Sequence, residues 1–257
     1  MGFSLPPSGS FWNWKGKGLI FDRPLIQACL IRRYQRFLAD VRLMDGKTMT
    51  VHCPNTGRME SCGSPGDTVY LSEHLSSKRK YRYSWEFTRA RAGLVGINTG
   101  RSNRLAEEAI MEGLIPDLQA YSSLQREVKY GDGSRIDILL SSEKLGRCWI
   151  EVKNVTLWQN GQLYFPDTVT ARGLKHLQEL KKQKKNGDRC ILFFVVNRAE
   201  GESVKPAFHL DPQWSETLLE AHTAGLEVMA FRAHNTLKGS KLTEAVPVDL
   251  RKEEENR

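Results

Sequence analysis

The chain has 257 residues, of which 40% are hydrophobic and 26% charged, and this balance excludes an intrinsically disordered or collagen-like protein. Its length allows one large domain or two modest ones. The longest apolar run, ILFFVV at residues 191–196, is far shorter than the ~20 residues that cross a bilayer, so we expect no membrane partner.

The net charge of +8 is concentrated in the N-terminal third. Residues 1–90 contain 14 Lys and Arg against 7 Asp and Glu, whereas the remainder contains 24 against 23. This asymmetry favours a polyanion such as nucleic acid as the partner, because proteins that neutralise phosphates gain affinity by releasing counterions. Solubility alone is the simpler explanation. The five cysteines show no CxxC spacing and are odd in number, which favours a reducing cytoplasm.

Residues 1–18 are rich in Gly, Ser, Pro and Lys and have no periodicity, so we predict an arm. From 19 to 90 the sequence predicts a small all-β domain. Five short runs rich in β-branched and aromatic residues are separated by turn signals, of which Asp45-Gly46 is the strongest. Five short strands without a long helix favour an OB-like barrel, a fold that often binds single-stranded nucleic acid.

Basic residues of this region are interleaved with tyrosines, and charge beside aromatic surface suits a nucleic-acid groove. If KRKYRY at residues 78–83 is a strand, then Lys78, Lys80 and Arg82 share one face. The alternatives are a solvated edge strand protected by its charges and a protein-interaction module. The predicted nucleic-acid-binding residues are Arg32, Arg33, Arg36, Lys78, Arg79, Lys80 and Arg82.

Residues 91–250 predict a mixed α/β domain, and residues 251–257 a tail. We expect a helix from about Ser102 to Gly113, two strands over 123–130 and 134–140, and a third over 147–155. Helices over about 168–185 and 211–224 then alternate with strands over 190–196 and 226–234. The order αβββαβαβ indicates a central sheet flanked by helices.

Two of these strands carry charged residues inside apolar runs. Because side chains alternate along a strand, Ile136 and Ile138 are expected on one face with Asp137 on the other, while Glu151 and Lys153 project together. On neighbouring strands the three charged residues would converge. The simpler explanation is ion pairing, of Glu151 with Lys153 and of Asp137 with Arg135.

The chemistry of these side chains favours a metal-dependent hydrolase. Two close carboxylates repel each other, and Mg²⁺, or Mn²⁺ in its place, relieves that repulsion at Asp137 and Glu151. Such an ion activates water and offsets charge on a phosphate, while Lys153 orients the water or stabilises the charge. A glutamate of the preceding helix often completes such sites, and periodicity does not choose between Glu107 and Glu108.

The residues Asp137, Glu151, Val152 and Lys153 resemble the PD-(D/E)xK nuclease signature, in which the carboxylates bind Mg²⁺ and the lysine assists phosphodiester hydrolysis. Longer motifs, spread over residues 25–232, are similar to the sugar fermentation stimulation protein A family. They include RRYQRFLADV, VHCPNTGRM, SEHLSSKRKY, YSSLQREVKYG, IEVKNVTL and YFPDTVTARGLKHLQEL.

The resemblance implies an OB-like domain followed by a PD-(D/E)xK nuclease-like domain, in a bacterial cytoplasmic protein that binds DNA without marked sequence preference and is linked to maltose and other sugar metabolism. It favours Glu108 over Glu107. Where the family usually reads TERGQKHL, this chain has Ala171 and Leu174 in place of a glutamate and a glutamine, which bears on catalysis. Lys175 and His176 are kept.

Two functions therefore compete. The preferred one is a DNA-binding protein with a Mg²⁺-dependent phosphodiesterase site formed by Asp137, Glu151, Lys153 and Glu108. The other is a non-catalytic, sequence-nonspecific DNA-binding regulator of sugar metabolism genes that keeps the nuclease fold as a scaffold.

Overall fold

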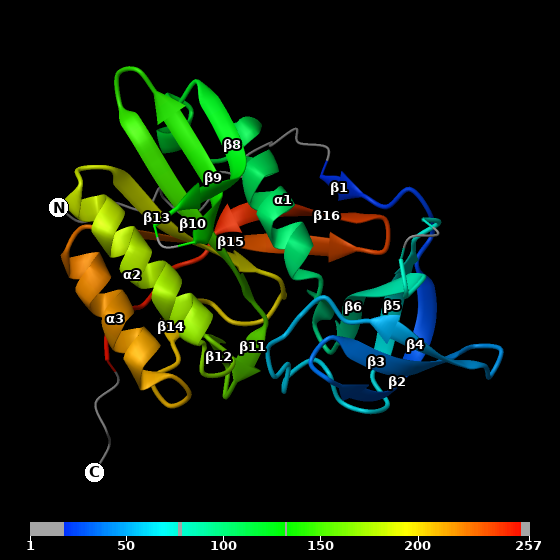
Figure 1. Cartoon of the computed structure of the whole chain (residues 1–257). Coiled ribbons are helices and arrows are strands. Elements are labelled where there is room, and N and C mark those ends of the chain that lie inside the picture. The colour runs from blue at the N-terminus through cyan, green and yellow to red at the C-terminus, as the bar shows by residue number, and fades with distance from the viewer. Residues whose placement is uncertain (1–17, 77–78, 132, 253–257) are drawn as a thin grey trace, which may run out of the picture.

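The computed structural model describes residues 18–76, 79–131 and 133–252, and shows two halves joined side by side (Figure 1). The smaller half is a β-barrel and the larger is a helix-flanked sheet. No helix within the described ranges has the length and apolar character needed to cross a bilayer.

The barrel is a six-stranded sheet in the order β4-β3-β2-β5-β6-β7, closed by a bridge between β4 and β6 at His52 and Ser84. Val41, Val51, Leu71 and Trp85 are among its fully buried core residues. The strands are β2 Ile26–Tyr34, β3 Leu38–Leu43, β4 Thr48–His52, β5 Thr68–Glu73, β6 Tyr83–Ala90 and β7 Gly93–Gly96.

In the described part of residues 78–83, no strand precedes Tyr83. Strand β6 begins only at Tyr83, and residues 79–82 form an irregular loop between β5 and β6. The loop is held by Arg82, whose guanidinium pairs with Glu73 on β5. Alternation along KRKYRY therefore does not sort these side chains into two faces, and Lys78 lies outside the described residues.

The larger half is built on a seven-stranded sheet in the order β1-β16-β15-β13-β10-β9-β8. The central strands β10, β13 and β15 are parallel, and the other neighbours are antiparallel. The strands are β1 Leu19–Ile20, β8 Ser123–Tyr130, β9 Ser134–Ser142, β10 Gly146–Val155, β13 Arg189–Val196, β15 Glu227–Thr236 and β16 Gly239–Ala245. A small separate sheet contains β11 Leu157–Gln159, β12 Gln162–Phe165 and β14 Val204–Pro206.

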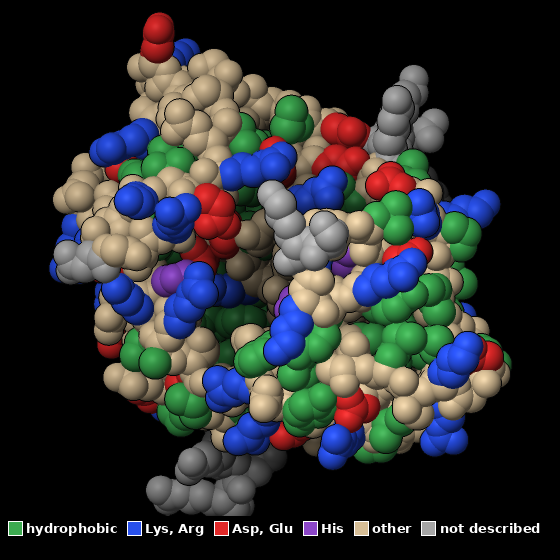
Figure 2. Space-filling model, turned by 45° about the vertical axis from the view of Figure 1, so that its right-hand side comes forward, with side chains coloured by type: hydrophobic (Ala, Val, Ile, Leu, Met, Phe, Trp, Pro, Cys, Tyr) green, Lys and Arg blue, Asp and Glu red, His purple; other side chains and the backbone are tan. Residues whose placement is uncertain are grey.

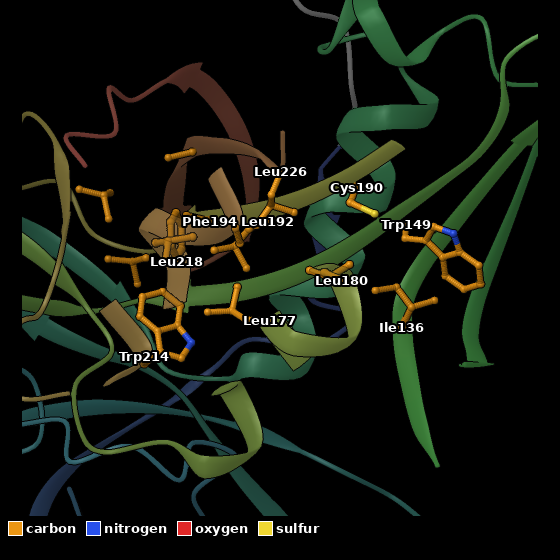
Figure 3. Packing of buried hydrophobic residues seen from close by; sticks show 14 of the residues in the cluster. Ile136, Trp149, Leu177, Leu180, Cys190, Leu192, Phe194, Trp214, Leu218 and Leu226 are labelled. Atoms are coloured by element: carbon orange, nitrogen blue, oxygen red, sulfur yellow. The ribbon is translucent and has the colours of Figure 1, made fainter. Parts of the chain in front are cut away.

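Helices cover both faces of this sheet. Helix α1 (Thr99–Met111) packs on one face, and α2 (Ala171–Lys185) and α3 (Pro212–Thr223) pack together on the other; a short 3₁₀ helix, η1, spans Pro116–Leu118. Figure 3 shows the core beneath α2 and α3, where Leu177, Leu180 and Trp214 meet the strand residues. Each α-helix begins at a side-chain cap, from Asn98, Thr170 and Asp211 respectively.

Near the junction, the order of the strands along the chain does not match their division between the two halves. Strand β7 belongs to the barrel sheet although it lies beyond the predicted domain boundary at residue 90. Strand β1 pairs with β16 in the larger sheet although it precedes the barrel in the sequence. The backbone N–H of Gly96 donates to the carbonyl of Asn197 at 2.8 Å. Arg101 of α1 donates to the buried Glu86 of the barrel at 2.6 Å. These bonds tie α1 and the large sheet to the barrel.

Candidate functional site

Asp137 lies where two strands separate. The pairing of β9 with β10 ends at Ile138 and Ile150. Beyond this point the N–H of Val152 donates to Asp137 Oδ2 at 2.7 Å, and Asn103 of α1 donates to Oδ1 at 2.7 Å. The carboxylate thus replaces a backbone acceptor and is fixed between the sheet and α1.

The predicted alternation fails at this residue. Ile136 packs in the core beneath α2 and α3, whereas Ile138 packs in the core beneath α1. The neighbouring strand is irregular at the same level, since Glu127 has a φ of +52°. Asp137 lies between these two isoleucines and accepts from Asn103 of α1.

Glu151 is the most deeply buried member of the site, with 2% of its surface exposed. Its Oε1 accepts from Lys153 Nζ at 2.5 Å and contacts His176 Nδ1, while its Oε2 has no hydrogen-bond partner among the described residues. Burial by itself raises the pKa of Glu151, but Lys153 and His176 outweigh that effect and hold the pKa below its ordinary value. Glu151 is therefore charged at neutral pH.

Asp137 has the opposite shift. Burial, and then the negative charge of Glu151, raise its pKa from 3.8 to about 6. Two carboxylates with these environments are the arrangement that a cation stabilises. Asp137, Glu151 and Lys153 are thus brought together as predicted.

The helix residue that faces Asp137 is Glu107 and not the predicted Glu108. Asn103 and Glu107 are four residues apart and share one face of α1, and both line a small recess with Asp137. Glu107 pairs with Arg126 of β8 at 2.5 Å. Glu108 lies on another face, next to the backbone of Gly18, where burial and then Glu112 raise its pKa.

Sequence reasoning did not assign His176, which α2 places against Glu151. The only signal was its retention in the family-like motif around residue 175. Further along the same buried face of α2 lies Glu179. Within the described ranges, neither its Oε2 nor the buried hydroxyl of Tyr130 has a hydrogen-bond partner. Burial, followed by the charges of Glu151 and Glu179, raises the pKa of Tyr130.

The predicted nucleic-acid residues have different environments. Arg33 donates to the backbone carbonyls of residues 36, 55, 57 and 58, so it holds the barrel loops together. Arg32 pairs with Asp40, and Arg82 pairs with Glu73. Arg36, Arg79 and Lys80 are exposed. Figure 2 shows the surface hollowed between the two halves, with acidic side chains on one wall and Lys and Arg around the rim.

The donor set suits a hard divalent cation. The described residues contain no ready-made group of three or more His, Cys, Asp or Glu side chains, and Glu151 Oε1 is already engaged by Lys153 and His176. The unpartnered Glu151 Oε2 and the carboxylate of Asp137 are nevertheless oxygen donors in a buried, mutually repelling pair. Oxygen donors of this kind, completed by water and backbone carbonyls, fit Mg²⁺ or Mn²⁺.

Both halves match known protein families. Residues 31–97 match the SfsA N-terminal OB domain, and residues 100–239 match the sugar fermentation stimulation protein RE domain. The chain belongs to the sugar fermentation stimulation protein family. The predicted fold class, an OB-like barrel followed by a nuclease-like mixed sheet flanked by helices, is thereby confirmed.

Relatives in the sugar fermentation stimulation protein family are similar over nearly their whole length. The homolog of Geobacter sulfurreducens is 50% identical over 230 residues, which cover 90% of this chain and 98% of the relative. That of Shewanella loihica is 49% identical over 234 residues, covering 90% and 100%. The solved structure of Pyrococcus furiosus SfsA in complex with Ca²⁺ has a TM-score of 0.83 and 28% identity, covering 90% and 99%.

Proposed function

We propose that this protein binds DNA and hydrolyses its phosphodiester bonds with the help of Mg²⁺ or Mn²⁺. The observation that carries the proposal is the buried Glu151 carboxylate, whose Oε2 has no hydrogen-bond partner in the described part of the chain, beside an Asp137 whose pKa is raised to about 6. Burying two carboxylates together is costly unless a cation or proton compensates them. Family membership and the basic N-terminal half support DNA as the substrate.

Each residue has a distinct role in this proposal. Asp137 and Glu151 would hold the ion, which supplies Lewis acidity toward a phosphate oxygen and a more acidic bound water. Asn103 and the N–H of Val152 orient Asp137, and His176 orients Glu151. Lys153 donates to Glu151 and also stabilises charge that develops on the phosphate.

The solved P. furiosus relative supports the choice of ion. It is described in complex with Ca²⁺, a hard cation that takes oxygen ligands as Mg²⁺ does. Its similarity extends over 90% of this chain. Glu107, which faces Asp137, replaces Glu108 as the helix residue proposed to support the ion.

Calorimetric titration of Mg²⁺ and Mn²⁺ tests the proposal, with cleavage of single- and double-stranded DNA measured in parallel. Wild type should bind the ion and cleave DNA, and Glu151→Gln should lose both while remaining folded, as circular dichroism checks. Glu143→Gln, an exposed glutamate in the β9–β10 turn, is the matched control. Cleavage that persists in Glu151→Gln would exclude this site.

A second candidate is a non-catalytic, sequence-nonspecific DNA-binding regulator of maltose and other sugar metabolism genes. Two observations favour it: Lys153 and His176 already neutralise Glu151, and α2 carries Ala171 and Leu174 where the family-like motif has polar residues. This candidate predicts salt-sensitive DNA binding without cleavage in the presence of either ion.

A further inference from the structure

The barrel carries a concave basic surface next to its junction with the larger half. This groove has a volume of about 540 Å³, and none of its lining residues is Asp or Glu. It lies at the β2–β3 turn and the loop after β4, and one lining residue, Thr168, comes from the segment before α2. The arginines that line it are Arg32, Arg33, Arg36 and Arg58.

These arginines divide into one that builds the groove and three that can serve a ligand. Arg33 builds the groove, because its guanidinium donates to the backbone carbonyls described above. The pairs of Arg32 with Asp40 and Arg58 with Glu60 lie at the surface, and the arginine side chains are 68% and 56% exposed. Exposed ion pairs contribute only ~0–1 kcal/mol to stability. A phosphate that accepts two hydrogen bonds from one guanidinium therefore competes with them readily. Arg36 is exposed at the turn.

The groove is fixed relative to the Asp137–Glu151 site. Asp167 Oδ2 accepts from the N–H of Met59 at 3.1 Å and presses against Gly57, where an added Cβ would lie 2.2 Å from the carboxylate. Asp167 thus anchors the segment before α2 to the barrel loop. Its neighbour Thr168 forms the edge of the groove for that reason.

From this edge the chain leads directly to the site. Arg172 lies four positions after Thr168, a span of at most ~14 Å for an extended chain. Arg172 is exposed and lies 3.5 Å from His176 Nε2, and His176 contacts Glu151 through its other ring nitrogen. The groove and the site are therefore within reach of one short nucleic-acid segment.

We infer that this groove holds the sugar-phosphate backbone of the DNA strand whose neighbouring phosphodiester enters the Asp137–Glu151 site, with Arg36 and Arg58 as phosphate contacts. The inference rests on the proposed function, since it assumes a DNA substrate. Arg58 thereby becomes a proposed phosphate contact, although the sequence patterns did not suggest it. Arg33, which was predicted to bind nucleic acid, has a structural role instead. The loop at residues 79–82, with its exposed Arg79 and Lys80, is the competing surface.

Binding of a fluorescent 20-nucleotide single strand, followed by anisotropy at several salt concentrations with a metal chelator present, tests the inference. The double variant Arg36→Ala/Arg58→Ala should bind on the order of 10- to 50-fold more weakly at 0.1 M salt, with a salt slope lower by about 1.4. Arg42→Ala/Lys47→Ala removes the same charge from the barrel outside the groove and should bind nearly as wild type. Melting temperature and Mn²⁺ affinity should be unchanged in both.

The possible outcomes distinguish failure of the groove assignment from failure of DNA binding itself. If both double variants lose affinity equally, or if only Arg79→Ala/Lys80→Ala weakens binding, the groove assignment is wrong while DNA binding stands. If wild type fails to bind the strand even at low salt, the proposed function fails and the groove assignment with it.

Discussion

The carboxyl group of Asp137 makes folding stability depend on pH. Its pKa is raised to about 6, so the folded state holds a proton that the unfolded state, with a pKa near 3.8, releases. Stability due to this group is therefore highest at low pH, is lost as pH rises from about 4 to about 6, and stays reduced above that. A divalent ion bound to the pair would remove this cost.

Asp137→Asn should accordingly stabilise the protein without metal. We expect the free energy of unfolding to rise by about 1–3 kcal/mol at pH 7.5 and to change little at pH 4, because the variant removes only the cost of the buried charge. The amide oxygen still accepts from Val152. Urea denaturation at both pH values measures this, with Glu143→Gln as a control, and an equal loss of stability at both would contradict the raised pKa.

The proposed role of His176 in orienting Glu151 can be tested with substitutions whose amide group replaces one ring nitrogen or the other. Its Nδ1 contacts Glu151. An asparagine amide can take the place of Nδ1, whereas a glutamine amide takes the place of Nε2. We expect His176→Gln to lower Mn²⁺ affinity by about 10- to 100-fold, as loss of a ligand-orienting group does, and His176→Asn to retain most of it. Equal losses in two folded variants would show that His176 does not act through this contact.

At the scale of the element, helix α1 presents two adjacent glutamates to different surroundings. Glu107 faces Asp137 and pairs with Arg126, while Glu108 is half-buried beside Gly18 and has a raised pKa. Glu107→Gln should weaken Mn²⁺ binding on the order of tenfold in calorimetry, as substitutions that support metal ligands do. Glu108→Gln is its matched control and should bind normally, with equal or higher thermal stability at neutral pH because it removes a half-buried charge. The reverse pattern would restore Glu108 to the site.

The elements that the sequence predicted well are those with a complete local signal. Strand β8 matches its predicted range because turn residues bound an uninterrupted run. Helix α1 begins three residues before the predicted Ser102, since Asn98 supplies the cap. Strands β11, β12 and β14 are three or four residues long and were not predicted. β11 and β12 form a hairpin of very short strands around residues 160–161, and β14 joins β12 from a distant segment.

The same distinction applies to the candidate site. Glu151 and Lys153 were placed together because they lie two residues apart on one strand, and this local rule holds. The choice of Glu108 and the orientation of Asp137 both failed, because they depend on how α1 packs and on a change of face between Ile136 and Ile138 that simple alternation does not predict. His176 lies 25 residues after Glu151, so only tertiary structure brings them together.

At the scale of the whole molecule, Gly96 controls how closely the halves approach. A Cβ at this position would lie 2.4 Å from the Asn197 side chain, which hydrogen-bonds to Ser102 of α1 and Asn154 of β10. Gly96→Ala should lower the free energy of unfolding by about 1–3 kcal/mol through overpacking. It should also weaken DNA cleavage more than binding of Mn²⁺.

Gly100→Ala provides the control at the same junction, because its added methyl group meets only Asn98 Oδ1, at the longer distance of 3.3 Å. Calorimetric unfolding of both variants measures the difference. If Gly96→Ala melts as wild type does, the contact between Gly96 and Asn197 does not determine the docking of the halves.

The pairing of β1 with β16 sets an order for folding during synthesis. The barrel strands lie within residues 26–96, so the barrel can form soon after that segment leaves the ribosome. Leu19 and Ile20, by contrast, pair with Ser240 and Gly239, which are made about 220 residues later. At ~5–20 residues per second this delay is roughly 10–45 s. Leu19 and Ile20 therefore have no strand partner in the sheet until β16, the last strand of the described chain, is made. The seven-stranded sheet is complete only at the end of translation.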